Sequence, residues 1–245
     1  MMPANVSLFV TCLVDLCYPE VGRAAAALLR DAGVSVSFRE GQTCCGQPAY
    51  TAGFPLEARR MARRILDAFR GGDPVVVPSG SCAAMIRCSY PTLFRGEPEE
   101  RPARQLAGRT HELSAFLVDV LGLERIGGRL EARATYHDGC HGLRELGLGR
   151  QGRRLLAGIE GLELVEMERA DACCGFGGTF SVRLPGLATT MADEKLAHAA
   201  RTGATLLVSG DAGCLMHLGG RLSRTGPALR PAHLAEVLAE AGGLG

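Results

Sequence analysis

Short apolar runs alternate along the chain with longer stretches in which apolar residues recur at helical spacing. The run at residues 5–11 lacks the apolar-polar alternation of a half-exposed strand, and it ends at Cys12. A continuous apolar run of this length is typical of a parallel strand that is buried on both faces. Similar short segments predict strands at 34–38 and 74–77 in the first half of the chain, and at 134–137, 162–167 and 205–208 in the second.

Amphipathic stretches between these runs predict helices at 20–30, 55–69, 111–121, 187–200 and 232–241, and a short helix runs from Cys82 through Ile86. In the helix that begins at Pro55, the apolar face consists of Leu56, Met61, Ile65, Leu66 and Phe69. The charged segment 95–109 predicts a loop or an irregular helix start, and 122–128 predicts a connection between the halves. Strands that alternate with helices imply an α/β fold with right-handed βαβ units and a parallel sheet in each half.

The chain contains an internal repeat. Cys44-Cys45-Gly46 returns as Cys173-Cys174-Gly175, and the match extends to single cysteines that precede and follow each pair. A repeat of this length predicts two similar units, residues 1–122 and 123–245, related by pseudo-two-fold symmetry. We expect the cysteine groups of the two units to be related by the same approximate axis.

Composition narrows the functional classes. The 245 residues include 27 basic and 26 acidic side chains, and aromatic residues make up 5% with no tryptophan. Neither nucleic-acid binding nor a bulk attraction to anionic membranes is therefore expected. The N-terminal residues lack the features of a secretory signal, and no run of about 18 apolar residues predicts a membrane span. We expect a cytoplasmic protein, whose ten cysteines serve metal binding or redox chemistry better than a disulfide framework.

Four cysteines in each half fall just after predicted strands, at the sheet edge where open α/β sheets place their ligands. The candidate ligands are Cys12, Cys44, Cys45, Cys82, Cys140, Cys173, Cys174 and Cys214. The last cysteine of each half, Cys82 or Cys214, also lies near a predicted helix N-terminus, which favours a thiolate. Four thiolates suit an iron-sulfur cluster or zinc. Buried cysteines that only pack, and thiol-disulfide chemistry without a metal, are the alternatives.

Several other side chains are weaker candidates. Cys17 and Cys88 have no counterpart in the other half, so packing or peripheral thiols are expected there. His137 and His141 flank Cys140. An imidazole there could hydrogen-bond a cluster sulfide or move a proton. An ordinary loop histidine with satisfied hydrogen bonds is the simpler interpretation, above all for His137. Arg183 could hold a carboxylate or remain a solvated surface residue.

The motifs resemble those of a known family. They are Leu8-Phe-Val-Thr-Cys12, Cys44-Cys45-Gly46-Gln47-Pro48-Ala49, Pro78-Ser-Gly-Ser-Cys82, Cys173-Cys174-Gly175-Phe176-Gly177-Gly178-Thr179-Phe180-Ser181-Val182 and His233-Leu-Ala-Glu-Val-Leu238. By these, the chain is similar end to end to the cysteine-rich CCG-domain proteins, which include the iron-sulfur subunit of glycolate oxidase and the B subunit of heterodisulfide reductase. The resemblance implies two tandem Rossmann-like domains that carry iron-sulfur clusters, of the 4Fe-4S type.

Within that family the resemblance points to lactate utilization. It implies a three-protein iron-sulfur system that oxidises L-lactate to pyruvate, with a ferredoxin-type partner and a third subunit. The catalytic candidate is then His141, which would handle the proton while the clusters accept or relay electrons. A subunit acting on glycolate or on a heterodisulfide, a zinc-stabilised scaffold and a thiol redox regulator are the competing functions.

The chain departs from the family pattern at one position in each half. Family repeats often end in Cys-x-x-Cys, and five cysteines can bind a non-cubane pair of clusters, but here the fifth position holds Met85 or His217. The departure favours one four-thiolate site per half, with His217 as a further candidate ligand and zinc as an alternative metal in one site.

Overall fold

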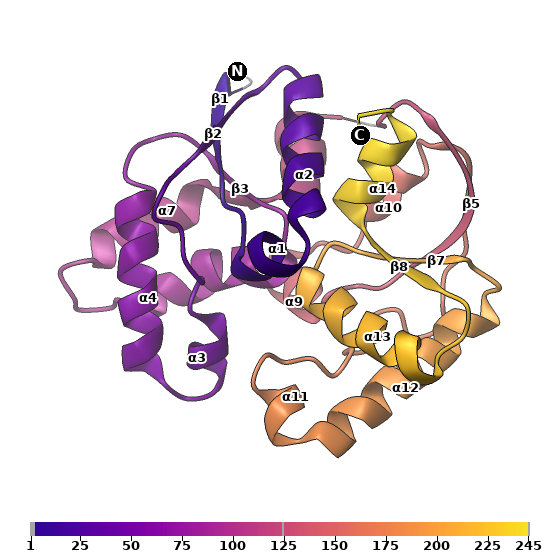
Figure 1. Ribbon diagram of the computed structural model, residues 1–245. Coiled ribbons are helices and arrows are strands. Elements are labelled where there is room, and N and C mark those ends of the chain that lie inside the picture. Colours follow the sequence, from indigo (N-terminus) through magenta and orange to yellow (C-terminus); the bar gives the residue numbers. More distant parts are fainter. Residues whose placement is uncertain (1–2, 124, 245) are drawn as a thin grey trace.

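The computed structural model describes residues 3–123 and 125–244, which form two similar halves (Figure 1). The first half contains β1 (Asn5–Leu8), α1 (Cys12–Cys17), α2 (Pro19–Asp31), β2 (Ser35–Phe38), α3 (Gln47–Thr51), α4 (Pro55–Ala68), β3 (Val75–Val77), α5 (Gly80–Ala84), α6 (Tyr90–Leu93), α7 (Glu100–Arg109), β4 (Thr110–Glu112) and α8 (Leu113–Ala115). Two π-helical segments, η1 (Met85–Ser89) and η2 (Phe116–Val120), continue α5 and α8.

The second half contains β5 (Arg129–Tyr136), α9 (Cys140–Leu146), α10 (Gln151–Leu156), β6 (Glu160–Leu164), α11 (Phe180–Arg183), α12 (Pro185–Arg201), β7 (Leu206–Ser209), α13 (Ala212–Thr225), β8 (Arg230–His233) and α14 (Leu234–Ala241). Each half is built on one four-stranded parallel sheet. The strand orders, β2-β1-β3-β4 and β6-β5-β7-β8, are equivalent. This is the α/β fold with two repeated units that the sequence predicts.

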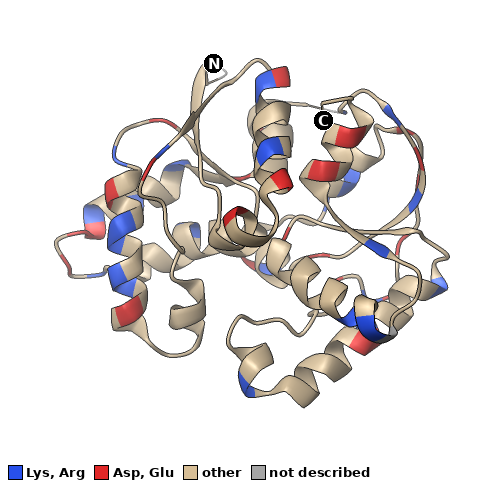
Figure 2. Cartoon of the chain, viewed as in Figure 1, with Lys and Arg blue, Asp and Glu red and all other residues tan. Residues whose placement is uncertain are grey.

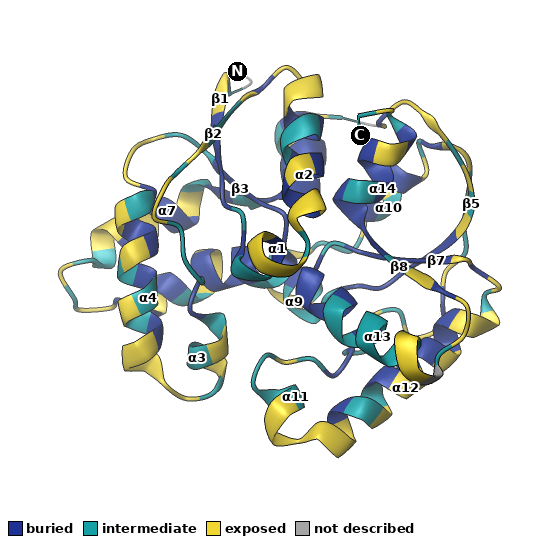
Figure 3. Cartoon of the chain, in the orientation of Figure 1, coloured by how far each residue is buried: buried dark blue, intermediate teal, exposed yellow. Residues whose placement is uncertain are grey.

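The two halves share a hydrophobic core. Helix α2 packs against α14 of the other half, and buried residues of both sheets belong to the same cluster. Each half also has a smaller core of its own, beneath α4 in the first half and α12 in the second. The buried positions therefore run continuously from one sheet to the other (Figure 3).

Two strands were wrongly predicted as the first turns of helices. The predicted helix 111–121 begins as β4, which pairs with β3 through Val77 and Glu112, and the predicted helix 232–241 begins as β8, which pairs with β7. In both places a strand runs directly into the helix without a loop, so no turn residue marks the boundary. Pairing with a buried neighbouring strand overrides the local helical pattern.

Other boundaries also differ from the predictions. Strand β1 ends at Leu8, where the chain turns toward α1. The segment 95–109, predicted as a loop or an irregular helix start, contains the ten-residue helix α7. The short helices α1, α3, α6, α9, α10 and α11 were not predicted from the sequence. Leu56, placed on the apolar face of α4, is 61% exposed, because Ala58, Ala62, Ile65 and Leu66 form the buried face.

The predicted connection 122–128 includes residue 124, which lies outside the described residues. The boundary between residues 122 and 123 falls between the two sheets and stays a prediction. Charged side chains gather on outer helices such as α4 and α12, whereas α3 carries none (Figure 2). Across residues 3–123 and 125–244, every helix is too short or too polar to span a lipid bilayer.

Candidate metal centre between the two halves

The four cysteines of the first half are brought together by three strand ends. Cys12 is the first residue of α1, which follows β1, and Cys44 and Cys45 lie in the loop after β2. Cys82 lies in the first turn of α5, which follows β3. The Sγ atoms of Cys45 and Cys82 are 3.4 Å apart. Because parallel strands end at the same sheet edge, residues distant in sequence meet there.

The second half repeats this arrangement. Cys140 is the first residue of α9, Cys173 and Cys174 lie in the loop after β6, and Cys214 lies in the first turn of α13. The loops match in detail, because the backbone N–H of Gly46 donates to Cys44 Sγ and that of Gly175 donates to Cys173 Sγ, each at 3.4 Å. N–H donors directed at sulfur stabilise a thiolate.

All eight cysteines line one cavity of about 210 Å³. The sequence predicts one site per half, and the structure brings the two groups of four to one shared cavity. We call these groups the first quartet (Cys12, Cys44, Cys45 and Cys82) and the second quartet (Cys140, Cys173, Cys174 and Cys214). Other lining residues include His141, Asp211 and Gly177.

Asp211 joins the two quartets. It is the N-cap of α13, where Oδ1 accepts hydrogen bonds from the N–H groups of Gly213 (3.1 Å) and Cys214 (3.4 Å). Its other oxygen, Oδ2, accepts from Ser81 N at 2.8 Å and from Ser79 Oγ at 3.3 Å in the other half. Ser79 is itself the N-cap of α5. One buried carboxylate therefore caps one cysteine-bearing helix and anchors the start of the other.

The glycine after each cysteine pair permits close packing. Gly46 and Gly175 have φ values of +87° and +88°, in the region that L side chains avoid. A Cβ at Gly46 would lie 2.9 Å from the carbonyl oxygen of Ala58, and one at Gly175 would lie 2.6 Å from that of Ala188. Glycine is thus needed both for the turn and for the contact of the loop with α4 or α12.

Neighbouring thiols bias which cysteine ionises. Hydrogen bonds from Cys12 and Cys45 lower the pKa of Cys44 to about 3, and those from Cys140 and Cys174 lower the pKa of Cys173 to about 2. The same hydrogen bonds, together with burial, raise the pKa of Cys12 and Cys140. The first cysteine of each pair is therefore the preferred thiolate in each quartet.

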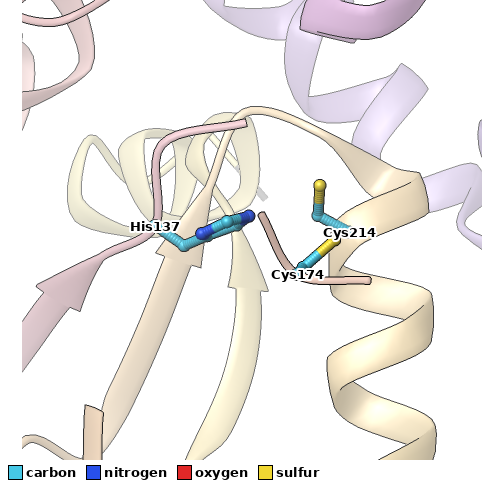
Figure 4. A group of neighbouring side chains, drawn as sticks. All are labelled: His137, Cys174 and Cys214. Atoms are coloured by element: carbon cyan, nitrogen blue, oxygen red, sulfur yellow. The ribbon is translucent and has the colours of Figure 1, made fainter. Parts of the chain in front are cut away.

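His137 is not the loop histidine with satisfied hydrogen bonds that its sequence favoured. It is fully buried after β5, and neither ring nitrogen has a hydrogen-bond partner among the described residues. A ring nitrogen and the Sγ atoms of Cys174 and Cys214 lie within 4.8 Å of one another, and Figure 4 shows the imidazole extending toward both sulfurs. Burial, followed by the charge of Lys195, lowers the pKa of His137 to about 4.

Lys195 is a buried cation behind the second quartet. It is 2% exposed on α12, and its Nζ donates to the carbonyl oxygens of Arg169 and Ala170, the latter at 3.0 Å. Burial lowers the pKa of Lys195, whereas nearby Asp171 and Cys174 act in the opposite direction. A lysine held by two carbonyl groups places positive charge next to the thiolates.

The remaining candidates lie in different places. His141 lines the cavity, and its Nδ1 pairs with Glu145 one turn later on α9. His217 lies on α13, where Nε2 donates to the carbonyl oxygen of Ala188 at 3.2 Å and the ring packs against Phe176. Cys17, Cys88 and Arg183 are exposed and are not among the cavity-lining residues of the described chain.

Lys195 and Asp211 were not among the residues predicted for the site, and His137 was predicted to be an ordinary loop histidine. Each had a signal in the repeat. His137 stands three residues before Cys140 where the first half has Phe9, and Asp211 stands three before Cys214 where the first half has Ser79. A polar residue in one repeat opposite an apolar or neutral one in the other marks a difference in the chemistry of the two sites.

The donor set fits an iron-sulfur cluster or a metal ion in each half. The quartets supply only thiolates at the cavity wall, the Gly46 and Gly175 amides donate to sulfur, and the orphaned imidazole of His137 adds a nitrogen donor. Thiolate sets of this kind hold 4Fe-4S clusters or tetrahedral zinc.

Comparison with known proteins gives a family match and close relatives. Residues 6–87 and 134–219 match the family of the CCG cysteine-rich domain. Lactate utilization protein A of Geobacillus kaustophilus (strain HTA426) is 51% identical over 96% of this chain and 98% of its own length, and that of Geobacillus thermodenitrificans (strain NG80-2) is 50% identical over the same shares. Lactate utilization protein A 2 of Bacillus cereus (strain Q1) is 44% identical, also over 96% and 98%.

A crystal structure shares the fold. The structure of a hypothetical protein from Helicobacter pylori aligns with a TM-score of 0.66 at 12% identity and covers 99% of this chain. The chain spans half the length of that protein. At this identity the likeness extends to the fold alone.

Proposed function

The chain belongs to the cysteine-rich CCG-domain family, and from this premise we propose that it is the iron-sulfur subunit of a cytoplasmic complex that oxidises L-lactate to pyruvate. The observation that carries the proposal is the pair of matching cysteine quartets that line one cavity. Two relatives that are 51% and 50% identical to this chain share the name lactate utilization protein A, and this name supports the choice of lactate.

The quartets would hold the clusters, one in each half. When bound, such a cluster supplies one-electron transfer at a potential set by its surroundings. The protein contributes N–H donors from Gly46 and Gly175, the buried Asp211 carboxylate that positions both cysteine-bearing helices, and the cation of Lys195 beside the second quartet.

Oxidation of L-lactate to pyruvate releases two electrons and two protons. We assign proton transfer to His141, because it lines the cavity and its pairing with Glu145 fixes the orientation of the ring. The cavity-lining residues of the described chain include neither arginine nor lysine, and Arg183 lies outside it. We infer that a partner subunit helps to bind the lactate carboxylate.

A ferredoxin-type partner would receive the electrons, and a third subunit would complete the system. Exposed apolar residues are suited to this assembly, since large exposed side chains mark interaction surfaces. Val182, Leu184 and Leu187 are exposed where α11 meets α12, and Phe54 and Leu56 are exposed at the equivalent place in the first half.

The decisive experiment compares the metal content of the wild type and of Cys174→Ser, both purified anaerobically. We expect about four irons and four sulfides per half in the wild type, and loss of one half's complement in Cys174→Ser. Growth on lactate should fail in that variant. Cys88→Ser is the matched control, because Cys88 is exposed and outside the cavity.

Two alternatives are separated by the same preparation. If the reconstituted complex acted on glycolate or a heterodisulfide but not on lactate, the function would be that of another branch of the family. Stoichiometric zinc in both halves with no iron would contradict the electron-transfer role and favour a scaffold.

A further inference from the structure

The two quartets match in their thiolates but differ in what surrounds them. Phe9 in the first half is buried against Phe69, with ring centroids 5.5 Å apart, and the equivalent position in the second half is His137. The contacts of Gly46 with Ala58 and of Gly175 with Ala188 align α4 with α12, and this alignment places Lys195 opposite Ile65. Two buried apolar residues of the first half are thus replaced by two buried bases in the second.

No hydrogen bond of normal geometry accounts for the burial of the His137 imidazole, although the carbonyl oxygen of Ala170 lies close enough to oppose the lowering of its pKa. Both nitrogens lack a partner among the residues that the structure describes, and the side chain has no exposed surface. A buried polar group without a partner costs stability. Phe9 occupies the equivalent position in the first half, which shows that an apolar aromatic side chain fits there. Packing alone therefore does not require histidine.

Two sulfurs of the second quartet lie close to the His137 imidazole. A ring nitrogen and the Sγ atoms of Cys174 and Cys214 lie within 4.8 Å of one another, close enough to surround one metal ion (Figure 4). Two thiolates and an imidazole form a donor set typical of zinc and ferrous iron.

We propose that His137 is a metal ligand, so that the second half binds its metal through nitrogen and sulfur whereas the first half binds through sulfur alone. The bond could be made to one iron of a cluster or to a single zinc ion, and both share the metal-imidazole bond. Lys195 belongs to the same adaptation, since its buried charge balances the thiolates. The inference rests on the proposed function only in requiring that the second quartet binds metal.

The test is spectroscopy on full-length protein that contains metal in the second half only, obtained with Cys45→Ser and Cys82→Ser in the first quartet. Protein labelled with 15N-histidine would be examined by electron-nuclear double resonance if iron is bound, and by X-ray absorption at the zinc edge if zinc is bound. We expect a directly coordinated histidine nitrogen in either case. A first shell of sulfur alone, with no histidine coupling, would overturn the proposal without any variant of His137.

Variants then identify the histidine. His137→Phe installs the residue of the first half and should remove the nitrogen signal while circular dichroism stays unchanged; if it fails to fold, His137→Asn serves instead. His217→Met, which also copies the first half, and His141→Ala should keep the signal. Persistence of the signal in both His137 variants would refute the assignment.

The outcomes separate this inference from the proposed function. Iron with a sulfur-only shell would leave the electron-transfer role intact and reject the His137 ligand. Zinc with a histidine nitrogen would support the ligand and argue against the electron-transfer role.

Discussion

Gly46 and Gly175 show how single residues shape the quartets. Each follows a cysteine pair, has a positive φ and donates its N–H to the first sulfur of that pair. Each also lies against a helix backbone, where a side chain would collide with a carbonyl oxygen. The position of the two pair cysteines therefore depends on a residue that has no side chain.

Gly46→Ala should destabilise the protein and weaken metal binding in the first half. The left-handed backbone alone costs an L residue about 1–2 kcal/mol, and the contact 2.9 Å from Ala58 O adds to that loss. Gly53→Ala is the control, because Gly53 has a φ of +85° but no atom within 4 Å of a Cβ. Urea unfolding and iron content measure the two effects. Equal losses in both variants would show that the packing contact is unimportant.

The repeat marks the cysteines that gather at the cavity, and their role as ligands stays a prediction. All eight cavity-lining cysteines follow from the two matching motifs, and the helix N-terminal placement of Cys82 and Cys214 follows from the strand pattern. The environment of His137 could not be predicted, because its nearness to Cys174 and Cys214 depends on how three separate loops meet. Local sequence carries no information about that distance.

Among the secondary-structure elements, the last strand of each half runs directly into the last helix, and the final residue of the strand is the N-cap of the helix. Glu112 ends β4 and caps α8, accepting from Ser114 N at 2.8 Å, and His233 ends β8 and caps α14, accepting from Ala235 N at 3.1 Å. Because the N-cap residue also belongs to the strand, the helical pattern of the sequence extends over the end of the strand. A strand of three or four residues is then not recognised. The sequence therefore predicted these helices but not the strands before them.

The cap of α14 should make stability depend on pH. His233 Nδ1 can accept the bond from Ala235 only when it is unprotonated, and burial lowers the pKa of His233 to about 4 from 6.5. A lowered native pKa means that its stabilising contribution is present above pH 6.5 and is lost as the pH falls toward 4. At about 1.36 kcal/mol per pKa unit, the loss has an upper limit of roughly 3 kcal/mol.

His233→Asn keeps a capping side chain and removes the titration. We expect the free energy of unfolding of the wild type to fall more steeply than that of the variant between pH 6.5 and 4. Measuring both proteins in chelator removes the contribution of metal binding. Since other titrating groups such as Glu112 are common to both, they cancel in the difference. Parallel profiles would contradict the assignment.

At the scale of the whole molecule, the two halves meet through a shared hydrophobic core and a shared cavity. The repeat predicted two similar halves, but it could not predict that α2 and α14 share a core or that both quartets face one cavity. Those features depend on how the halves dock, and residues at a docking surface have the same apolar character as residues of an ordinary core. The docking also makes the halves unequal, because one aspartate serves both.

Asp211 and Ser79 occupy equivalent cap positions and meet across the centre, with Ser79 Oγ 3.3 Å from Asp211 Oδ2. Aspartate is as good an N-cap as serine, so Ser79→Asp should be harmless if α5 were considered alone. In the assembled molecule it would bring two buried carboxylates together. Two like charges about 4 Å apart repel by about 4 kcal/mol at an effective permittivity of 20.

We therefore expect Ser79→Asp to lower the free energy of unfolding by a few kcal/mol. Adding Asp211→Ser moves the single carboxylate to the other half and should restore much of the loss. Asp211→Ser alone keeps a capping side chain on α13 but should destabilise, because Ser81 N and Ser79 Oγ lose their acceptor. Urea unfolding of the three variants completes a double-mutant cycle. Additive effects would mean that the two caps act independently, and that the centre does not couple the halves through one shared charge.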